Sequence, residues 1–284
     1  MKATVSAPAS TANLGPGYDC LGMALSPRCV VDADSAPDWV VEHVGRFAPG
    51  PDETDAVLEA VRKVSDHPLK LVVDNHVPIG KGLGSSAAAL VAGIAAGLMA
   101  STGEAPPDRV FRLAAEMEGH PEQVAAAVYG GVILMPAEGP PMRLPVHPGL
   151  RPLVAVPESR LATETARGAV EEVQPLPRVV RSLARMSALT AGLLTGDPQF
   201  LAAAHGDEIH EAPRAELSPE VATLMDVARR AGALHAARSG AGPSVLALVT
   251  AENEAAVRAA FERAGCEVVG GTVEATGLIT SLGE

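Results

Sequence analysis

The sequence predicts an α+β protein built from two lobes. The chain has 284 residues, 47% of them hydrophobic, which is enough to bury a sizeable core and to divide into two lobes of ordinary size. Strand-like and helix-like patterns alternate along it, without internal repeats or low-complexity tracts. A proline-rich stretch at residues 136–152 interrupts both periodicities. We therefore expect an N-terminal lobe at 1–150 and a C-terminal lobe at 151–284.

In the first lobe, alternation of apolar and polar residues predicts strands at residues 2–6, 29–33, 39–44 and 69–75. Apolar residues at helical spacing predict helices at 55–65, 85–100, 108–118 and from about 122. The apolar run 87–100 has 14 residues, fewer than the roughly 20 that cross a bilayer, so it predicts a buried core helix. Gly93 and Gly97 within it predict close packing of this helix on a sheet.

The second lobe shows the same alternation of signals. Strands are expected at residues 153–157 and 244–250 and again near the end of the chain. Helices are expected at 163–173, 178–194, 218–231 and 251–264.

Composition excludes several classes of function. Charged residues make up 20% of the chain and the net charge is −12, so the field of the molecule repels nucleic acid and anionic membranes. The three cysteines, Cys20, Cys29 and Cys266, form no CxxC pair or metal-binding cluster. The N-terminus lacks the apolar stretch of a secretory signal. We expect a reduced, cytoplasmic protein without nucleic-acid or membrane partners.

A glycine-rich turn at residues 78–84 carries the first specific chemistry. Gly80, Gly82 and Gly84 permit positive φ and let backbone N–H groups approach a ligand. Ser85 and Ser86 then begin a helix, whose unpaired N–H groups attract an anion. The same residues would also suit an ordinary capped helix after a flexible turn. The spacing fits neither GxxxxGK[ST] nor GxGxxG, which disfavours a Walker loop and a dinucleotide loop.

Three motifs together resemble those of the GHMP kinases, a family named for galactose, homoserine and mevalonate substrates. They are residues 7–19, 78–88 and Ser239-Gly240-Ala241-Gly242-Pro243-Ser244, in the order of that family and across nearly the whole chain. The resemblance implies a two-lobe GHMP kinase fold, with a ribosomal protein S5 domain 2-like N-terminal lobe and a ferredoxin-like C-terminal lobe. It also implies ATP and Mg²⁺. The implied nucleotide-binding residues are Pro78, Ile79, Gly80, Lys81, Gly82, Leu83, Gly84, Ser85, Ser86, Ala87 and Ala88.

Residues 10–19 resemble most closely the members of that family that phosphorylate L-homoserine. Asn13 offers amide donors and an acceptor, Asp19 offers a negative charge for an ammonium group, and Gly-Pro-Gly between them forms a turn. Asn and Asp beside glycines are also common turn formers that bond their own backbone.

The resemblance also implies the remaining site residues. Ser86 and a glutamate are expected to bind the metal, with Glu116 preferred and Glu118 second, so Asn13, Ser86 and Glu116 form the expected catalytic set. The implied substrate-binding residues are Asn13, Asp19, His120, Gln123, Arg167, Arg214 and Gly240. Guanidinium groups suit the substrate carboxylate. Members of the family more often have Asp-Asn at Glu122-Gln123, which puts a substrate contact by Gln123 in question.

We therefore expect a cytoplasmic, ATP-dependent phosphotransferase that forms O-phospho-L-homoserine in threonine biosynthesis, and a homodimer is compatible with the sequence. One alternative is a GHMP kinase for another alcohol, such as mevalonate, shikimate or a sugar. A second is a non-catalytic module that senses nucleotide. A relative that phosphorylates and then decarboxylates its substrate is disfavoured by residues 10–19.

Overall fold

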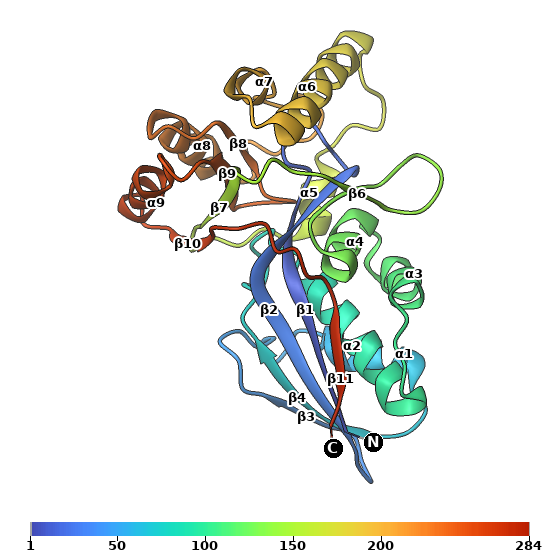
Figure 1. The fold of residues 1–284 in the computed structure, drawn as a ribbon. Helices are drawn as coiled ribbons and strands as arrows, with labels where there is room; N and C mark the ends of the chain where they lie inside the picture. Colours follow the sequence, from blue (N-terminus) through green and yellow to red (C-terminus); the bar gives the residue numbers. More distant parts are fainter. Residues whose placement is uncertain (1, 284) are drawn as a thin grey trace.

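The computed structural model describes residues 2–283 and contains two β-sheets flanked by helices (Figure 1). The larger sheet has the order β11-β1-β2-β4-β3, and β5 and β6 extend it from β2. Its strands are β1 (Ala3–Ala12), β2 (Leu21–Ser35), β3 (Val40–His43), β4 (Leu69–Asn75), β5 (Val132–Leu134), β6 (Met142–Leu144) and β11 (Ile279–Leu282). All pairs are antiparallel except β3 with β4.

The helices of the first half of the chain lie on one face of this sheet (Figure 1). They are α1 (Ala56–Val64), α2 (Ser85–Thr102), α3 (Pro107–Glu118) and α4 (Pro121–Tyr129). Asp55 begins α1, because its carboxylate accepts hydrogen bonds from the N–H groups of Val57 and Leu58. Alternate residues of β4 are buried, as expected for a strand covered on one face.

The smaller sheet is antiparallel and has the order β10-β7-β9-β8. Its strands are β7 (Arg151–Val156), β8 (His235–Arg238), β9 (Val245–Val249) and β10 (Glu267–Gly270). The second half also contains α5 (Thr163–Gly168), α6 (Leu176–Thr195), α7 (Pro198–Ala203), α8 (Glu220–Arg230) and α9 (Glu254–Arg263). Val221, Leu224 and Phe261 of α8 and α9 pack with this sheet in a core of their own.

Helix α2 is long and apolar enough to cross a membrane by length and composition, but it lies mostly buried inside the protein. Its two glycines approach α1 rather than the sheet, which corrects the expected partner. A Cβ atom on Gly93 would lie 2.7 Å from Ala60 Cβ, and one on Gly97 would lie 2.6 Å from Val64 Cγ2. The glycines therefore let α1 and α2 pack closely.

The expected α+β architecture is confirmed, with differences at several elements. Strand β1 continues to Ala12, so half of the first motif is strand rather than loop. Helix α5 ends at Gly168, before the expected end at 173. Strand β11 pairs with β1 and so joins the sheet of the first half, across the predicted boundary at residue 150. The division into 1–150 and 151–284 stays a prediction.

Candidate active site

The three glycine turns identified in the sequence meet at one place. Ser239 Oγ donates a hydrogen bond to the carbonyl of Gly82 at 2.7 Å, and the Gly240 N–H donates to the carbonyl of Ala12 at 3.1 Å. A Cβ atom on Gly82 would lie 2.2 Å from the Ser239 carbonyl oxygen, and φ is 76° at Gly82. Only glycine fits at this position. Gly82 therefore allows the loop and the third motif to come into direct backbone contact.

The loop leads directly into the N-terminus of α2. Gly84 is the N-cap, with φ 64°, and no side chain caps the helix. The first N–H groups of α2 therefore have no side-chain acceptor, and the positive end of the helix dipole lies at the loop. This arrangement favours a bound anion such as a phosphate.

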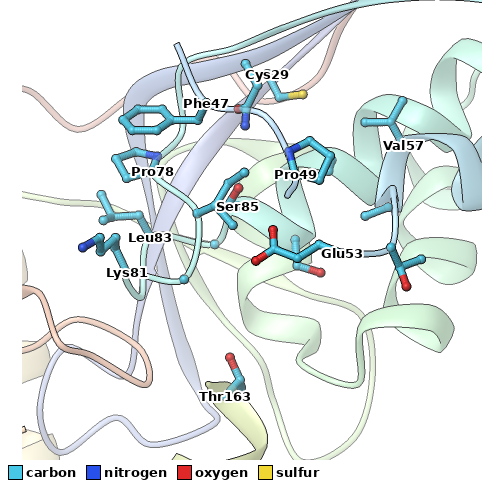
Figure 2. A pocket seen from close by; sticks show the side chains of 18 of the residues that line it. Cys29, Phe47, Pro49, Glu53, Val57, Pro78, Lys81, Leu83, Ser85 and Thr163 are labelled. Atoms are coloured by element: carbon cyan, nitrogen blue, oxygen red, sulfur yellow. The ribbon is translucent and has the colours of Figure 1, made fainter. Parts of the chain in front are cut away.

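A cavity of about 340 Å³ opens beside the loop (Figure 2). Each residue from Pro78 to Ser86 lines it, whereas Ala87 and Ala88 are buried in α2 and do not. Thr163 lines it from the second half of the chain, on the side of the loop away from Cys29 and Phe47 in Figure 2. Apolar side chains from the sheet, from the segment between β3 and α1 and from α1 also line the cavity, namely Cys29, Phe47, Pro49, Ala56, Val57 and Val73.

Of the two expected metal ligands on α3, the second choice lies at the loop. Ser86 Oγ donates a hydrogen bond to Glu118 Oε2 at 2.6 Å, and Glu118 lines the cavity. Glu116 instead lines a separate hollow with Arg109 and Arg112. Two residues along a helix turn the side chain by about 200°, so the two glutamates face opposite sides of α3. The geometry therefore favours Glu118 over Glu116.

The oxygens at this point suit a magnesium ion. Mg²⁺ prefers oxygen ligands, takes one or two from the protein, and completes its shell with phosphate and water. A hydroxyl and a carboxylate in contact, Ser86 and Glu118, supply such a pair. Within residues 2–283 no group of three or more His, Cys, Asp or Glu side chains could hold a metal ion by itself.

The first motif forms a strained turn next to the third. Asn13, Leu14 and Asp19 all have positive φ, at 71°, 51° and 53°. Asn13 is buried, its Nδ2 donates to the carbonyl of Gly240 at 3.2 Å, and its Oδ1 accepts from the Asp19 N–H at 3.0 Å. Backbone strain of this kind persists where the surrounding contacts enforce it, often at functional sites.

Arg167 of α5 connects this turn to the loop region. Its Nη2 lies 2.9 Å from Asp19 Oδ1, and its Nε donates to His120 Nε2. His120 Nδ1 in turn lies 3.8 Å from Glu118 Oε1. Hydrogen bonds therefore join Ser86 to Glu118 and join His120 through Arg167 to Asp19, and the two groups approach each other to 3.8 Å at Glu118 and His120, whose Nδ1 has no hydrogen-bond partner.

Arg214 lies buried behind the same turn and contacts neutral groups. It donates to the carbonyl of Ala166 at 2.8 Å and lies 3.1 Å from His210 Nδ1 and 5.4 Å from the centre of the Tyr18 ring. Burial lowers the pKa of His210 to about 4, so its imidazole is neutral near pH 7. Among the ion pairs of the described residues, none includes Arg214. A buried guanidinium of this kind suits a carboxylate from a ligand.

The two positions that depart from the Asp-Asn pattern are both buried at the start of α4. A Cβ atom on Gly84 would lie 2.8 Å from Gln123 Oε1, and one on Gly240 would lie 3.3 Å from its Nε2. Gln123 therefore lies between the loop and the third motif. Burial raises the pKa of Glu122 to about 7, and its Oε2 has no hydrogen-bond partner.

Two residues near the site were not singled out from the sequence. Tyr18 stacks on the His210 ring at 4.8 Å, and its place inside the first motif could have indicated it. Arg160 lies over Gly80, 3.6 Å from the position of a Cβ atom there, and no sequence pattern marks it. Lys81, expected at the nucleotide, donates to the carbonyls of Pro157, Glu158 and Ser159 instead.

Family models and curated relatives cover most of the chain. The model of the GHMP kinases N-terminal domain matches residues 54–131, and that of the GHMP kinases C-terminal region matches 186–267. A homoserine kinase of Clavibacter michiganensis is 41% identical over 86% of this chain and 81% of its own length. A homoserine kinase of Moorella thermoacetica is 35% identical over 92% of this chain and 93% of its own length.

Solved structures share the fold over the whole chain. The crystal structure of homoserine kinase from Cytophaga hutchinsonii has a TM-score of 0.82 and 27% identity, covering 99% of this chain and 97% of that one. The L. major mevalonate kinase in complex with R-mevalonate has a TM-score of 0.73 at 19% identity, covering 98% and 97%. At this lower identity, the similarity to the mevalonate kinase shows a shared fold and nothing more.

Proposed function

The chain belongs to the GHMP kinase family, and we propose that it transfers the γ-phosphoryl group of ATP to the side-chain hydroxyl of L-homoserine. The product would be O-phospho-L-homoserine, an intermediate of threonine biosynthesis. The proposal includes a cytoplasmic location and a small-molecule substrate. Curated relatives of this activity at 35% identity or more over most of the chain support it.

The loop and α2 provide the phosphate end of the proposed site. Backbone N–H groups at the start of α2 would receive the phosphates, and the loop glycines allow the close approach. Phosphoryl transfer has a loose transition state, so positioning and neutralisation of charge account for most of the catalysis. The loop residues around Gly84 and the start of α2 would provide both.

Ser86 and Glu118 would hold Mg²⁺ at this end. When bound, the ion would neutralise charge on the phosphate oxygens of ATP. Glu118 replaces Glu116 in this role because its carboxylate contacts Ser86.

The acceptor end has the charges that an amino acid requires. Asp19 would receive the ammonium group, and Arg167 and Arg214 would receive the carboxylate. Asn13 would orient the hydroxyl toward the phosphate, because its side chain is fixed between Asp19 and Gly240. Gln123, His120 and Gly240 would line the space between the two ends.

The observation that carries the proposal is the set of contacts from Ser86 to Asp19. It joins a phosphate-binding helix start to a pair of opposite charges through Glu118, His120 and Arg167. A sugar or mevalonate kinase would need no ammonium site, so the charged acceptor end favours homoserine. A non-catalytic nucleotide sensor would not need the contact between Ser86 and Glu118.

A coupled assay of ADP release tests the proposal. Homoserine, mevalonate, shikimate and galactose are compared at equal concentration with ATP and Mg²⁺. We expect turnover with homoserine at least about 100-fold above the others, because mevalonate and shikimate carry a carboxylate without an ammonium group and galactose carries neither, so none of them supplies both charges that the acceptor end would receive. Absence of homoserine turnover would reject the proposal, and turnover of another alcohol would identify the alternative.

A further inference from the structure

The turn of the first motif packs against two histidines from the second half of the chain. His210 and His235 are both completely buried. His210 Nε2 lies 2.8 Å from the carbonyl oxygen of Gly15, and His235 Nε2 lies 2.8 Å from that of Leu14. Both histidines therefore support the turn of residues 13–19.

His210 differs from His235 in the contact of its second ring nitrogen. His210 Nδ1 lies 3.1 Å from Arg214 Nη1, whereas His235 Nδ1 has no hydrogen-bond partner. The His210 ring also stacks on Tyr18 at 4.8 Å, and the Arg214 guanidinium lies 5.4 Å from the centre of the same Tyr18 ring. His210 therefore joins the turn to the arginine that would receive the substrate carboxylate.

The two partners of His210 require the same neutral tautomer. A carbonyl oxygen can only accept, so the proton lies on Nε2, and Asp207 Oδ1, at 3.7 Å from this nitrogen, favours it there. A guanidinium can only donate, so Nδ1 accepts from Arg214. A protonated ring would set two donors against each other. Burial, which lowers the pKa of His210 to about 4, keeps the ring neutral near pH 7.

Neutral acceptors hold the guanidinium of Arg214 in place. Its Nε donates to the carbonyl of Ala166 at 2.8 Å, and its Nη1 contacts both His210 Nδ1 and the carbonyl of Gly240, the latter at 3.4 Å. These contacts fix the direction of the guanidinium without adding a negative charge. Because recognition of a carboxylate by arginine depends on this direction, a residue that fixes it affects substrate binding without touching the substrate.

We propose that His210 is a positioning residue for substrate recognition, which holds Arg214 in the orientation that binds the carboxylate of homoserine and joins it to the turn of residues 13–19. The inference rests on the proposed function. Since His210 would not contact the substrate, loss of its hydrogen bonds should weaken recognition of the carboxylate specifically.

The test compares L-homoserine with 3-aminopropan-1-ol, which keeps the hydroxyl and the ammonium group but has no carboxylate. The ratio of their kcat/KM values, from ADP release at saturating ATP and Mg²⁺, measures recognition of the carboxylate. In His210→Phe, which keeps a ring beside Tyr18 but makes neither hydrogen bond, this ratio should fall about tenfold or more. A loss of packing alone would lower both kcat/KM values equally and leave the ratio unchanged.

The chain offers a matched control in His235. It is equally buried, donates to a carbonyl of the same turn and stacks on another ring, that of His205, at 5.2 Å. Within residues 2–283, no hydrogen bond joins His235 to Arg214. His235→Phe should keep the ratio within about twofold of wild type even where both kcat/KM values change. A fall equal to that in His210→Phe would contradict the role assigned to Arg214.

Two further variants test the hydrogen bonds and the link to Arg214. Glutamine carries one donor and one acceptor, as the neutral imidazole does, so His210→Gln should keep a ratio at least about threefold above that of His210→Phe. In Arg214→Met the ratio should already be low. Adding His210→Phe to it should then change the ratio by less than about twofold, because both changes remove one interaction.

Each outcome decides the inference. A wild-type ratio near one, an unchanged ratio in His210→Phe, no recovery in His210→Gln, or a further fall in the double variant would overturn it. Circular dichroism checks folding, and if His210→Phe does not fold, His210→Leu, with its smaller side chain, replaces it. Homoserine turnover by the wild-type protein with an unchanged ratio in His210→Phe rejects this inference alone. Absence of homoserine turnover rejects the proposed function and this inference with it.

Discussion

Glu118 and Glu116 lie two residues apart on α3, and only Glu118 contacts Ser86. We expect Glu118→Gln to lower kcat by about 100-fold or more, because it removes a charge from the proposed metal site. It should also raise the Mg²⁺ concentration needed for half-maximal rate. Glu116→Gln is the matched control and should keep both values within about twofold of wild type. Equal losses in the two variants would contradict the assignment of Glu118.

Glu211 has a buried carboxyl group, which affects stability rather than chemistry. Its Oε1 accepts from the Arg238 N–H, and burial raises its pKa from 4.5 to about 7. The folded state therefore holds this proton more tightly than the unfolded state. The resulting stabilisation is complete below about pH 4.5 and is lost as the pH rises through about 7, a change on the order of 3 kcal/mol.

Glu211→Gln should remove that dependence, because glutamine keeps the acceptor and carries no proton that titrates. We expect the variant to gain melting temperature relative to wild type at pH 8 and to gain less at pH 5. Thermal denaturation at the two pH values measures this. If the melting temperatures of the variant and the wild type differ by the same amount at pH 8 and at pH 5, Glu211 ionises normally in the folded protein.

Single residues were predictable from the sequence where a motif fixed their spacing. Asn13, Asp19 and the loop from Pro78 to Ser86 come together as the motifs indicated. The sequence could not decide between Glu116 and Glu118. Both lie on one predicted helix, and packing determines which face of that helix turns toward the loop. Arg160 had no signal, since it falls in no motif and lies near Gly80 only in the folded protein.

At the scale of elements, the packing of α2 on α1 depends on two small residues. Gly93→Ala improves helix propensity by about 1 kcal/mol, but its Cβ would lie 2.7 Å from Ala60 Cβ and from the Val57 carbonyl oxygen. We expect a net loss of about 1–3 kcal/mol in the free energy of unfolding, measured by urea denaturation.

Gly168→Ala is the matched control for this prediction. Gly168 ends α5, and a Cβ atom there would meet no heavy atom within 4 Å. The variant should be as stable as wild type or slightly more stable. Equal stability of Gly93→Ala and wild type would show that α1 moves away at little cost.

Elements were predicted well where one periodicity runs long enough to be recognised. The strand expected at residues 69–75 coincides with β4, because Leu69, Leu71 and Val73 place an apolar side chain at every second position of it. Strand β8 was missed, since His-Ala-Ala-Arg is buried at each position and shows no alternation. Helix α7 was missed because it has only six residues.

At the scale of the whole molecule, the last strand ties the two halves together. Strand β11 covers the edge of β1, and Arg28 of β2 donates to the carbonyls of Thr276 and Gly277 at 3.2 and 2.6 Å. Residues 1–150 alone would lose these contacts and expose an unpaired strand edge, which favours aggregation.

We therefore expect residues 1–150, expressed alone, to aggregate or to unfold without a cooperative transition in circular dichroism. The full chain, measured in parallel, should unfold cooperatively. A soluble and cooperative fragment would instead support the first lobe as an independent domain. The sequence could not indicate the pairing of β1 with β11, because periodicity is a local signal and these strands lie at opposite ends of the chain.

The ion pair between Asp19 and Arg167 has a consequence for selectivity. With no substrate present, the two charges neutralise each other, so this pair by itself holds little net attraction for a simple anion or a simple cation. A ligand with one charge would contact one partner and leave the other without its ion pair. Only a zwitterion exchanges both contacts at once. The pair therefore acts as a test for two charges together, which admits an amino acid and disfavours the hydroxy acid or the amino alcohol that carries half of its features.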